Sequence, residues 1–169
     1  VYANPITGLC VGKYDQRKNL EIVIIAVIEL NKLGNTAFLY VIGSADNQER
    51  IIFRNNLIKK FAYNFIKFKS NIPHQNMKEY YINYDVFILV SKNETASVSQ
   101  LEAMSYGIPV IISKDNGTAS YCKDGGFIIN HKKNEIKNSL IELINNDKYN
   151  LAFHWLSIKK MGYSRGEEG

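Results

Sequence analysis

The chain has 169 residues, which is enough for one domain with a substantial hydrophobic core. Its 46% hydrophobic and 22% charged residues are typical of a globular protein, and no apolar run reaches the roughly 18 residues of a membrane span. The net charge of +5 suits an anionic partner, but it is equally compatible with simple solubility. The start, VYANPITGLC, lacks the basic and apolar regions of a signal peptide.

Apolar runs alternate along the chain with segments of helical periodicity. The runs predict short buried strands at residues 8–12, 37–42, 63–68, 85–90, 109–112 and 126–129. Apolar residues at helical spacing predict helices at residues 19–33, 47–60, 75–83, 97–106 and 135–145. Gly34 and Gly107 are expected to end the first and the fourth of these helices.

This order of elements predicts the fold class. Strands with little polar alternation, each followed by a helix, favour an α/β fold with a doubly wound parallel sheet, Rossmann-like and covered on both faces. We expect one domain over residues 1–161, with helix or tail in its last part, and a flexible tail over residues 162–169, where the sequence GYSRGEEG is polar and rich in glycine.

In such a fold, ligands bind outside the carboxyl ends of the strands. The segments that follow the strands gather small residues, hydroxyl groups and two lysines, Lys13 and Lys18, at one edge of the sheet. These segments are residues 13–18, 43–45, 69–73, 91–97 and 113–118. Loops of every such fold contain polar residues, so the loops alone do not identify a ligand.

The helix predicted at 97–106 is more informative. Its first turn, at residues 96–99, would offer free backbone N–H groups that attract phosphate. The spacing of Val98, Leu101 and Met104 predicts the buried stripe of this helix.

Two carboxylates flank this helix start. Glu102 lies beside the predicted stripe, where it could accept two hydrogen bonds from a vicinal diol such as ribose, and Glu94 would reach another part of the same ligand. A nucleoside diphosphate sugar has this layout. Alternatively, Glu102 is a solvated helix residue and Glu94 a charge that favours the helix dipole. Taken alone, the two residues leave both interpretations open.

Five segments in order resemble a known family. NETASVSQLEAMSYGIPVI is similar to the E-x7-E segment of retaining glycosyltransferases with the GT-B fold, in particular glycosyltransferase family four, whose usual form is E-G-F-G-x-x-x-x-E-A-M-A-x-G-x-P-V. The further segments are VGKYDQRKNLE, YVIGS, NMKEYYINYDVFILVSKNE and SKDNGTASYCKDGGFII. The resemblance implies that this chain is one half of a GT-B fold, the C-terminal donor-binding domain, and that the N-terminal acceptor domain is missing.

The resemblance also implies roles for the charged residues. Lys18 matches the lysine that binds the donor diphosphate, and Lys13 stands where the family usually has arginine, so it keeps the charge but loses the bidentate fork. Glu102 matches the glutamate that holds the ribose hydroxyls. Glu94 matches the glutamate that contacts the transferred sugar and is needed for catalysis.

The remaining site residues follow from the same resemblance. Gly43 matches the turn glycine near the nucleotide, and Asn71 and Ile72 fall where the family packs the nucleobase. Backbone N–H groups at the helix start would come from Ala96, Ser97 and Val98.

The chain also departs from the family pattern. The family's E-G-F-G becomes Glu94-Thr95-Ala96-Ser97, which leaves the identity of the donor sugar open, because glycines there let the backbone approach the ligand. The spacing from Lys13 to Lys18 is one residue shorter than expected. An acidic residue common in the loop after the fifth strand has no clear counterpart among residues 116–118.

The implied function is transfer of a hexose, with retention, from a nucleoside diphosphate sugar (UDP-linked) to a hydroxyl of a lipid-linked or glycan acceptor. The setting would be bacterial surface polysaccharide or glycolipid synthesis in the cytoplasm, with peripheral contact at the inner face of the membrane. No cofactor or metal is expected, because the lysines would neutralise the leaving diphosphate. The spacing of metal ligands is absent from the three histidines, His74, His131 and His154, which are expected at the surface. The isolated chain is expected to bind donor without transferring it.

Two alternatives stay open. One is a non-catalytic module that binds a nucleotide or nucleotide sugar. The other is a nucleic-acid or membrane-surface protein that uses its lysine clusters, but these are interrupted and show no nucleic-acid motif, so we expect solvated faces and no nucleic-acid partner. Cys10 and Cys122 cannot form a framework, and we expect two reduced thiols, as in a cytosolic protein.

Overall fold

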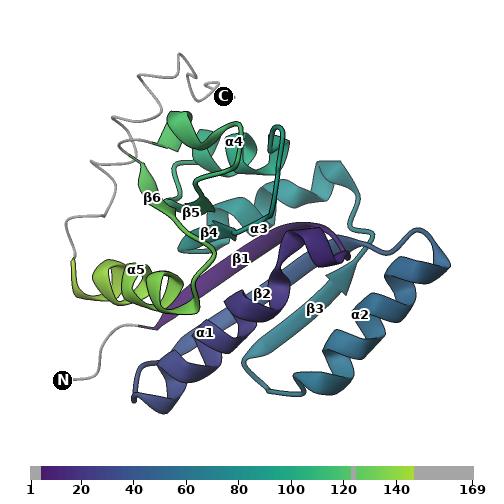
Figure 1. Cartoon of the computed structure of the whole chain (residues 1–169), viewed down its shortest axis with the longest axis horizontal. Helices are drawn as coiled ribbons and strands as arrows, with labels where there is room; N and C mark the ends of the chain where they lie inside the picture. Colours follow the sequence, from purple (N-terminus) through teal and green to yellow (C-terminus); the bar gives the residue numbers. More distant parts are fainter. Residues whose placement is uncertain (1–4, 123–124, 147–169) are drawn as a thin grey trace.

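The computed structural model of the chain describes residues 5–122 and 125–146. These residues form a six-stranded sheet in the order β3-β2-β1-β4-β5-β6, and every neighbouring pair of strands is parallel (Figure 1). The strands are β1 (Ile6–Lys13), β2 (Ala37–Ser44), β3 (Ile66–Ser70), β4 (Val86–Leu89), β5 (Val110–Ser113) and β6 (Gly126–Ile129). The predicted doubly wound α/β fold is thus confirmed. The predicted domain end at residue 161 and the tail lie outside the described residues.

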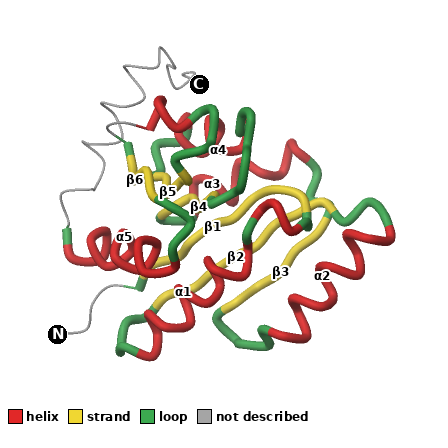
Figure 2. Tube along the Cα trace, in the orientation of Figure 1, coloured by secondary structure: helices red, strands yellow, loops and turns green. Residues whose placement is uncertain are grey.

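Helices cover both faces of the sheet (Figures 1 and 2). The helices are α1 (Leu20–Lys32), α2 (Gln48–Lys60), α3 (Met77–Asn83), α4 (Val98–Ser105) and α5 (Lys133–Asn145), with short 3-10 helices at Gln16–Lys18, His74–Asn76 and Ala119–Cys122. One hydrophobic cluster joins the sheet to α1, α2 and α5, and a second joins it to α3 and α4. The helices after β1 and β2 therefore lie on the opposite face from those after β3 and β4.

The two clusters explain why the strands show no polar alternation. Successive side chains of a strand point to opposite faces, so Leu9 and Cys10 of β1 belong to different clusters, and so do Phe87 and Ile88 of β4. Because both faces are buried, both sets of side chains are apolar. Cys10 and Cys122 are free and buried, and burial raises the pKa of each thiol to about 12.

Some predicted boundaries were wrong. β1 begins at Ile6, before the predicted residue 8, because its ladder with β2 pairs every residue from Ile6 to Lys13. β3 was predicted at residues 63–68 but begins at Ile66, since the N–H of Ile66 closes a turn onto the carbonyl of Tyr63. The helix stops were right: Gly34 and Gly107 have φ of 90° and 78°, conformations that glycine adopts without a steric penalty.

The predicted buried stripe of α4 was right for Met104 but wrong for Val98 and Leu101. Val98 is 67% exposed, and Leu101 is only partly buried. The buried face carries Gln100, Ala103 and Met104. Hydrophobic spacing misplaced this face because it could not anticipate that a glutamine would be buried and fully hydrogen-bonded. None of the helices in the described part of the chain is long and apolar enough to cross a membrane.

Candidate functional site

The centre of the sheet provides the crevice expected of a doubly wound fold. β1 and β4 are neighbours, although the chain leaves β1 toward β2 on one side and β4 toward β5 on the other. Ligands of such sheets bind outside the carboxyl ends of the strands at this switch point. Lys13 is the last residue of β1, Lys18 ends the 3-10 helix that follows, and Glu94 lies in the loop after β4.

Lys18 and Glu94 meet across this switch point. The ammonium Nζ of Lys18 lies 2.5 Å from Oε2 of Glu94, and each side chain is only 11% exposed. Asp15 caps the 3-10 helix by accepting a hydrogen bond from the N–H of Lys18. The N–H of Lys92 donates to the carbonyl of Arg17, 2.8 Å away, which ties the loop after β4 to the loop after β1. Local capping and this cross-loop bond together fix the ion pair.

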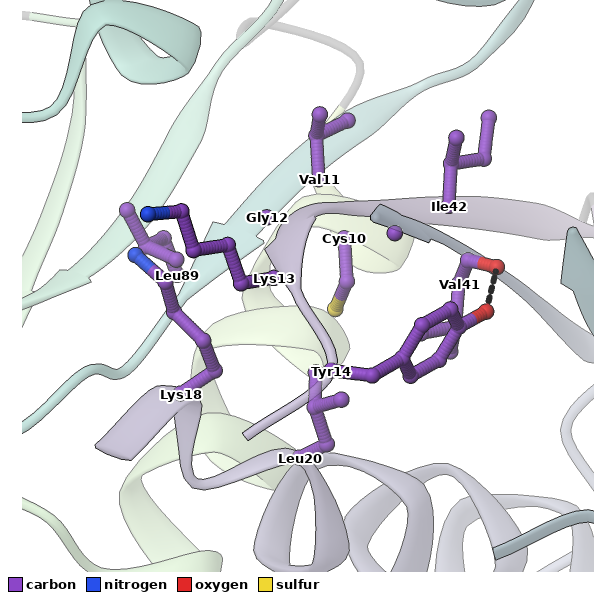
Figure 3. Close-up of a pocket in the computed structure, with 11 residues that line it drawn as sticks. Cys10, Val11, Gly12, Lys13, Tyr14, Lys18, Leu20, Val41, Ile42 and Leu89 are labelled. Carbon is purple, nitrogen blue, oxygen red and sulfur yellow. Dashed lines mark hydrogen bonds between the residues drawn. The ribbon is translucent and has the colours of Figure 1, made fainter. Parts of the chain in front are cut away.

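A pocket beside the ion pair collects other predicted residues. Gly12, Lys13, Lys18, Gly43 and Leu89 all line it. In Figure 3 the side chains of both lysines extend past Leu89 on the same side of β1. Both lysines therefore place positive charge on the same side of the crevice.

The loop that carries Glu94 is pinned to the loop after β5. The N–H of Asn93, at a φ of 52°, donates to the carboxylate of Asp115 at 3.0 Å, and the N–H of Gly117 donates to the carbonyl of Glu94 at 2.8 Å. A Cβ atom at Gly117 would lie 1.8 Å from the carbonyl oxygen of Thr95. The two backbones therefore approach each other more closely than any side chain would permit.

Asp115 also joins this loop to the start of α5. Its Oδ1 lies 3.1 Å from Nε2 of His131, and the same nitrogen lies 2.9 Å from the carbonyl oxygen of Ser91. Burial raises the pKa of Asp115, but hydrogen bonds from Asn93 and Ser113 and the charge of His131 outweigh it, so the pKa is lowered overall. The ionised form of Asp115 is therefore the form that holds the loop.

A buried polar network supports the start of α4. Oε1 of Gln100 lies 2.7 Å from Oγ1 of Thr118 and 3.1 Å from Nδ2 of Asn116, and all three residues are at most 5% exposed. Ser97 is the N-cap: its hydroxyl accepts from the N–H of Gln100, and its own N–H donates to Thr118. In this structure that N–H is used inside the protein, so Ser97 could offer it to a ligand only by giving up Thr118.

Glu102 forms a second polar cluster with α3 and the segment before it. Its Oε2 accepts from the hydroxyl of Tyr81 at 2.9 Å, and its Oε1 lies 2.5 Å from Nε2 of His74. Tyr81 is 1% exposed and stacks on Tyr106 with ring centroids 5.6 Å apart. The hydrogen bond to Glu102 and its charge raise the pKa of His74, against a small opposing effect of burial.

Gly43 and Asn71 are joined by their backbones. The N–H of Asn71 donates to the carbonyl of Gly43, and its side-chain Oδ1 accepts from the N–H of Ala45, both at 2.9 Å. A Cβ atom at Gly43 would lie 2.6 Å from the ring of Tyr14, whose hydroxyl reaches the carbonyl of Lys69 at 2.7 Å. The ring of Tyr14 therefore already requires glycine at this position. Ile72 packs against the second core cluster.

The structure thus separates the predicted residues into two groups. Lys13, Lys18 and Gly43 line one pocket, and Glu94 contacts Lys18 beside it. Glu102 instead contacts Tyr81 of α3. Sequence reasoning missed a second set of residues, which hold these groups in place. This set comprises Tyr14, His74, Tyr81, Gln100, Asp115, Gly117, Thr118 and His131. Tyr14, Asp115, Gly117 and Thr118 lie in the segments 13–18 and 113–118 that the sequence places at the binding edge, and this position is the clue that the sequence held.

Metal-ligating residues do not cluster in the described ranges. No group of three or more His, Cys, Asp or Glu side chains within residues 5–122 and 125–146 is arranged to hold a metal ion.

Comparison with known proteins identifies the family. Residues 2–154 match the family described as glycosyl transferases group 1, and the chain belongs to this family. It is 26% identical over 142 residues to the GtfA subunit of the UDP-N-acetylglucosamine–peptide N-acetylglucosaminyltransferase of Streptococcus pneumoniae, covering 79% of this chain and 27% of that protein. It is 24% identical over 128 residues to the alpha-monoglucosyldiacylglycerol synthase of Acholeplasma laidlawii, covering 76% and 32% respectively. The chain spans about a third of the length of these relatives.

Solved structures define the fold. Sucrose-phosphate synthase from Thermosynechococcus elongatus superposes with a TM-score of 0.81 at 21% identity, over 96% of this chain and 42% of that one. The C-terminal domain of a group 1 glycosyl transferase from Francisella tularensis gives 0.77 at 20% identity, over 91% and 85%. Anabaena HepE, solved in complex with UDP and glucose, gives 0.76 at 16% identity, over 94% and 45%. The predicted fold, one half of GT-B and its C-terminal domain, is confirmed.

Proposed function

We propose that this chain is the donor-binding domain of a retaining hexosyltransferase, which moves a sugar from a nucleoside diphosphate sugar to a hydroxyl acceptor. The observation that carries the proposal is the contact between Lys18 and Glu94 at the carboxyl ends of β1 and β4, with Lys13 lining the same pocket. A cation for the diphosphate and a carboxylate for the sugar meet where such folds bind ligands. The UDP in the HepE complex supports a nucleotide in this class of fold.

The ion pair suggests how donor binding prepares the site. Lys18 and Glu94 are largely withdrawn from water, so neither charge is well solvated. A diphosphate that enters the pocket would take the ammonium group of Lys18 and release the carboxylate of Glu94 toward the hydroxyls of the transferred sugar. Lys13 would add a second cation, and both would stabilise the negative charge that grows on the leaving diphosphate.

The other predicted residues take roles around this centre. Glu102 would accept the ribose hydroxyls, and Asn71 and Ile72 would pack the nucleobase. The backbone N–H groups of Ala96 and Val98 would face the phosphates from the start of α4. The donor sugar stays open, because Thr95 and its neighbours replace the family's glycines.

The acceptor and the setting are inferred from the relatives and are part of the proposal. One relative is named as a peptide N-acetylglucosaminyltransferase subunit and another as a glycolipid synthase. A lipid-linked or glycan acceptor, held by an N-terminal domain in the whole protein at the cytoplasmic face of a membrane, fits the glycolipid synthase, whereas the name of the other relative indicates a peptide acceptor. Because the chain spans about a third of these relatives, we propose that alone it binds donor without transferring it.

Calorimetric titration of the chain with UDP, GDP and their glucose conjugates tests the proposal. We expect one nucleoside diphosphate to bind at a single site and its sugar conjugate to bind at the same site. A parallel assay for release of sugar separates binding from turnover, and the same assay on a two-domain parent would detect transfer. Failure of every nucleoside diphosphate to bind at millimolar concentration would contradict the proposal.

A further inference from the structure

Both oxygens of the Glu102 carboxylate already have a hydrogen-bond partner within the protein. Oε2 accepts from Tyr81 at 2.9 Å, and Oε1 lies 2.5 Å from Nε2 of His74. Because an ionised carboxylate only accepts hydrogen bonds, Nε2 of His74 carries the hydrogen. Each oxygen can accept a second hydrogen bond, but a vicinal diol that engages both oxygens, as the proposed role in ribose binding requires, must compete with these two donors for the space around the carboxylate.

The two donors differ sharply in how they are held. The side chain of His74 is 82% exposed and extends from a 3-10 helix of three residues, His74–Asn76. Tyr81 is 1% exposed, lies within α3 and stacks on Tyr106. Removing Tyr81 from Glu102 would leave a buried hydroxyl without a partner, whereas the imidazole of His74 would turn into water. His74 is thus the donor that a ligand can displace.

We propose that His74 holds one oxygen of Glu102 in the nucleotide-free protein and yields it to the ribose of an incoming nucleoside diphosphate, while Tyr81 stays in place and orients the carboxylate. This inference rests on the proposed function. It makes His74 a positioning residue that keeps Glu102 in the binding conformation before the ligand arrives. It also couples nucleotide binding to the proton on His74.

The direction of the coupling follows from the charges in the cluster. Among the described residues, Glu102 on α4 supplies the charge that acts on the imidazole, and Tyr81 on α3 and Tyr106 at the end of α4 are the other titratable groups of the cluster. Burial and the charge of Glu102 raise the pKa of Tyr81, so it does not titrate near neutrality. Contact with Glu102 raises the pKa of His74 in the free protein, and displacement would return it to its ordinary value.

Nucleotide binding should therefore expel a proton. Between the ordinary pKa of histidine and the raised value, the free protein keeps a proton that the complex loses. Affinity should fall as the pH is lowered through this window, because a charged His74 competes more strongly for Glu102. Below the window both states are protonated, and above it neither is, so the dependence on pH should disappear at both ends.

The test follows the imidazole resonances of the folded chain by NMR as the pH is varied, with and without saturating UDP. His74→Gln assigns the resonance, and amide shifts report independently whether UDP is bound. We expect UDP to lower the titration midpoint of His74, and Glu102→Gln to lower it without any ligand. A midpoint that stays unchanged or rises while amide shifts show bound UDP would overturn the role of His74 and leave the proposed function intact. Failure of UDP and GDP to bind at all would overturn both.

Affinity measurements separate displacement from a purely structural role. Between about pH 8 and about pH 6, the UDP affinity of the parent should fall further than that of His74→Gln, by a factor of about ten for each pKa unit by which UDP lowers the midpoint measured by NMR. The comparison with His74→Gln cancels the titration of the UDP phosphate itself. Gln75→Ala, an exposed neighbour on the same 3-10 helix, should behave as the parent. Tyr81→Phe should weaken binding equally at each pH. Equal pH dependence in the parent and His74→Gln would overturn the proposal.

Discussion

The loops at the carboxyl edge of the sheet are held in two different ways. The loops after β4 and β5, which carry Glu94 and the start of α4, are fixed by buried polar contacts among Gln100, Asn116 and Thr118. The loop after β1, which carries Lys18, and the end of β2, which carries Gly43, are fixed by the buried Tyr14, whose hydroxyl donates to backbone carbonyls, and by backbone hydrogen bonds. The proposed sugar-binding carboxylate thus stands on a polar frame, a network of buried side-chain hydrogen bonds, whereas the proposed diphosphate-binding cations stand on one buried ring and on hydrogen bonds to the backbone.

This difference has a physical consequence. A buried polar network fixes the direction of its members, because each lost hydrogen bond leaves a group without a partner. The contact between the ring of Tyr14 and Gly43 does not fix a direction in this way. We infer that the orientation of Glu94 is the stricter requirement, whereas the ammonium groups, at the ends of the long lysine side chains, can adjust to a phosphate.

The largest expected effect comes from Gly117→Ala in the polar frame. Its Cβ would lie 1.8 Å from the carbonyl oxygen of Thr95, so the loops after β4 and β5 must separate. We expect a loss of about 3 kcal/mol in the free energy of unfolding, near the upper end for overpacking, and a fall in Tm of at least about 5 °C. Thermal denaturation measures this.

Gly34→Ala provides the control for Gly117→Ala. Gly34 has a φ of 90° and open space around it, so alanine there introduces backbone strain without a clash. We expect a cost of about 1 kcal/mol. A Gly117→Ala protein as stable as the Gly34→Ala protein would show that the two loops are not locked together.

A smaller loss is expected when the polar network is opened at Gln100. Gln100→Leu keeps the size of the side chain but leaves Asn116 without an acceptor for its amide, in a region where Gln100 and Asn116 are at most 3% exposed. We expect a loss of roughly 2 kcal/mol, measured by denaturant unfolding. Gln48→Leu, the same change at an exposed position of α2, should have almost no effect, and equal losses in the two variants would argue against the frame.

The lysine loop after β1 is tested by ligand binding rather than by stability. Lys18→Met should weaken UDP binding by roughly 10- to 100-fold, because a charge-assisted contact to the diphosphate is lost, and should leave uridine binding unchanged. Glu94→Ala should spare UDP and impair recognition of a UDP-sugar. Calorimetry with the three ligands distinguishes these outcomes, and an equal loss of UDP and uridine affinity in Lys18→Met would refute a diphosphate role.

The smallest effect is expected at Asp115, where the frame reaches the surface. Its pKa is lowered in the folded protein, so its stabilising contribution is present above the unfolded pKa of about 4 and is lost as the pH falls through the folded pKa. The parent should exceed Asp115→Asn in stability by roughly 0.5 kcal/mol or less at neutral pH, with no advantage at low pH. Denaturant midpoints at both pH values check this. An advantage that grew on acidification would contradict the sign.

The sequence predicted the fold and the charged residues much better than the frame that supports them. Strand and helix positions follow from hydrophobic spacing, and Lys18 and Glu94 follow from a pattern that survives in the sequence. The same spacing placed Val98 in the core, where the structure buries Gln100 instead. A buried polar residue depends on partners from distant loops, here Asn116 and Thr118, and no local period encodes that meeting.

The cluster at Glu102 could not be predicted from the sequence for the same reason. His74 and Glu102 are 28 residues apart, and Tyr81 lies on α3, whereas Glu102 lies on α4. The prediction that His74 lies at the surface is confirmed, since its side chain is 82% exposed. Its contact with Glu102, the residue expected to bind ribose, was not predicted. Only the crossover from β3 through α3 to β4 and α4 brings the three side chains together.

The most direct measurement is a crystal structure of the chain grown with UDP. Our account predicts the diphosphate within hydrogen-bonding distance of the ammonium group of Lys18, the ribose on the carboxylate of Glu102, and Glu94 free of Lys18. A nucleotide bound away from the carboxyl ends of β1 and β4, or a diphosphate held elsewhere while Lys18 and Glu94 stay paired, would contradict it.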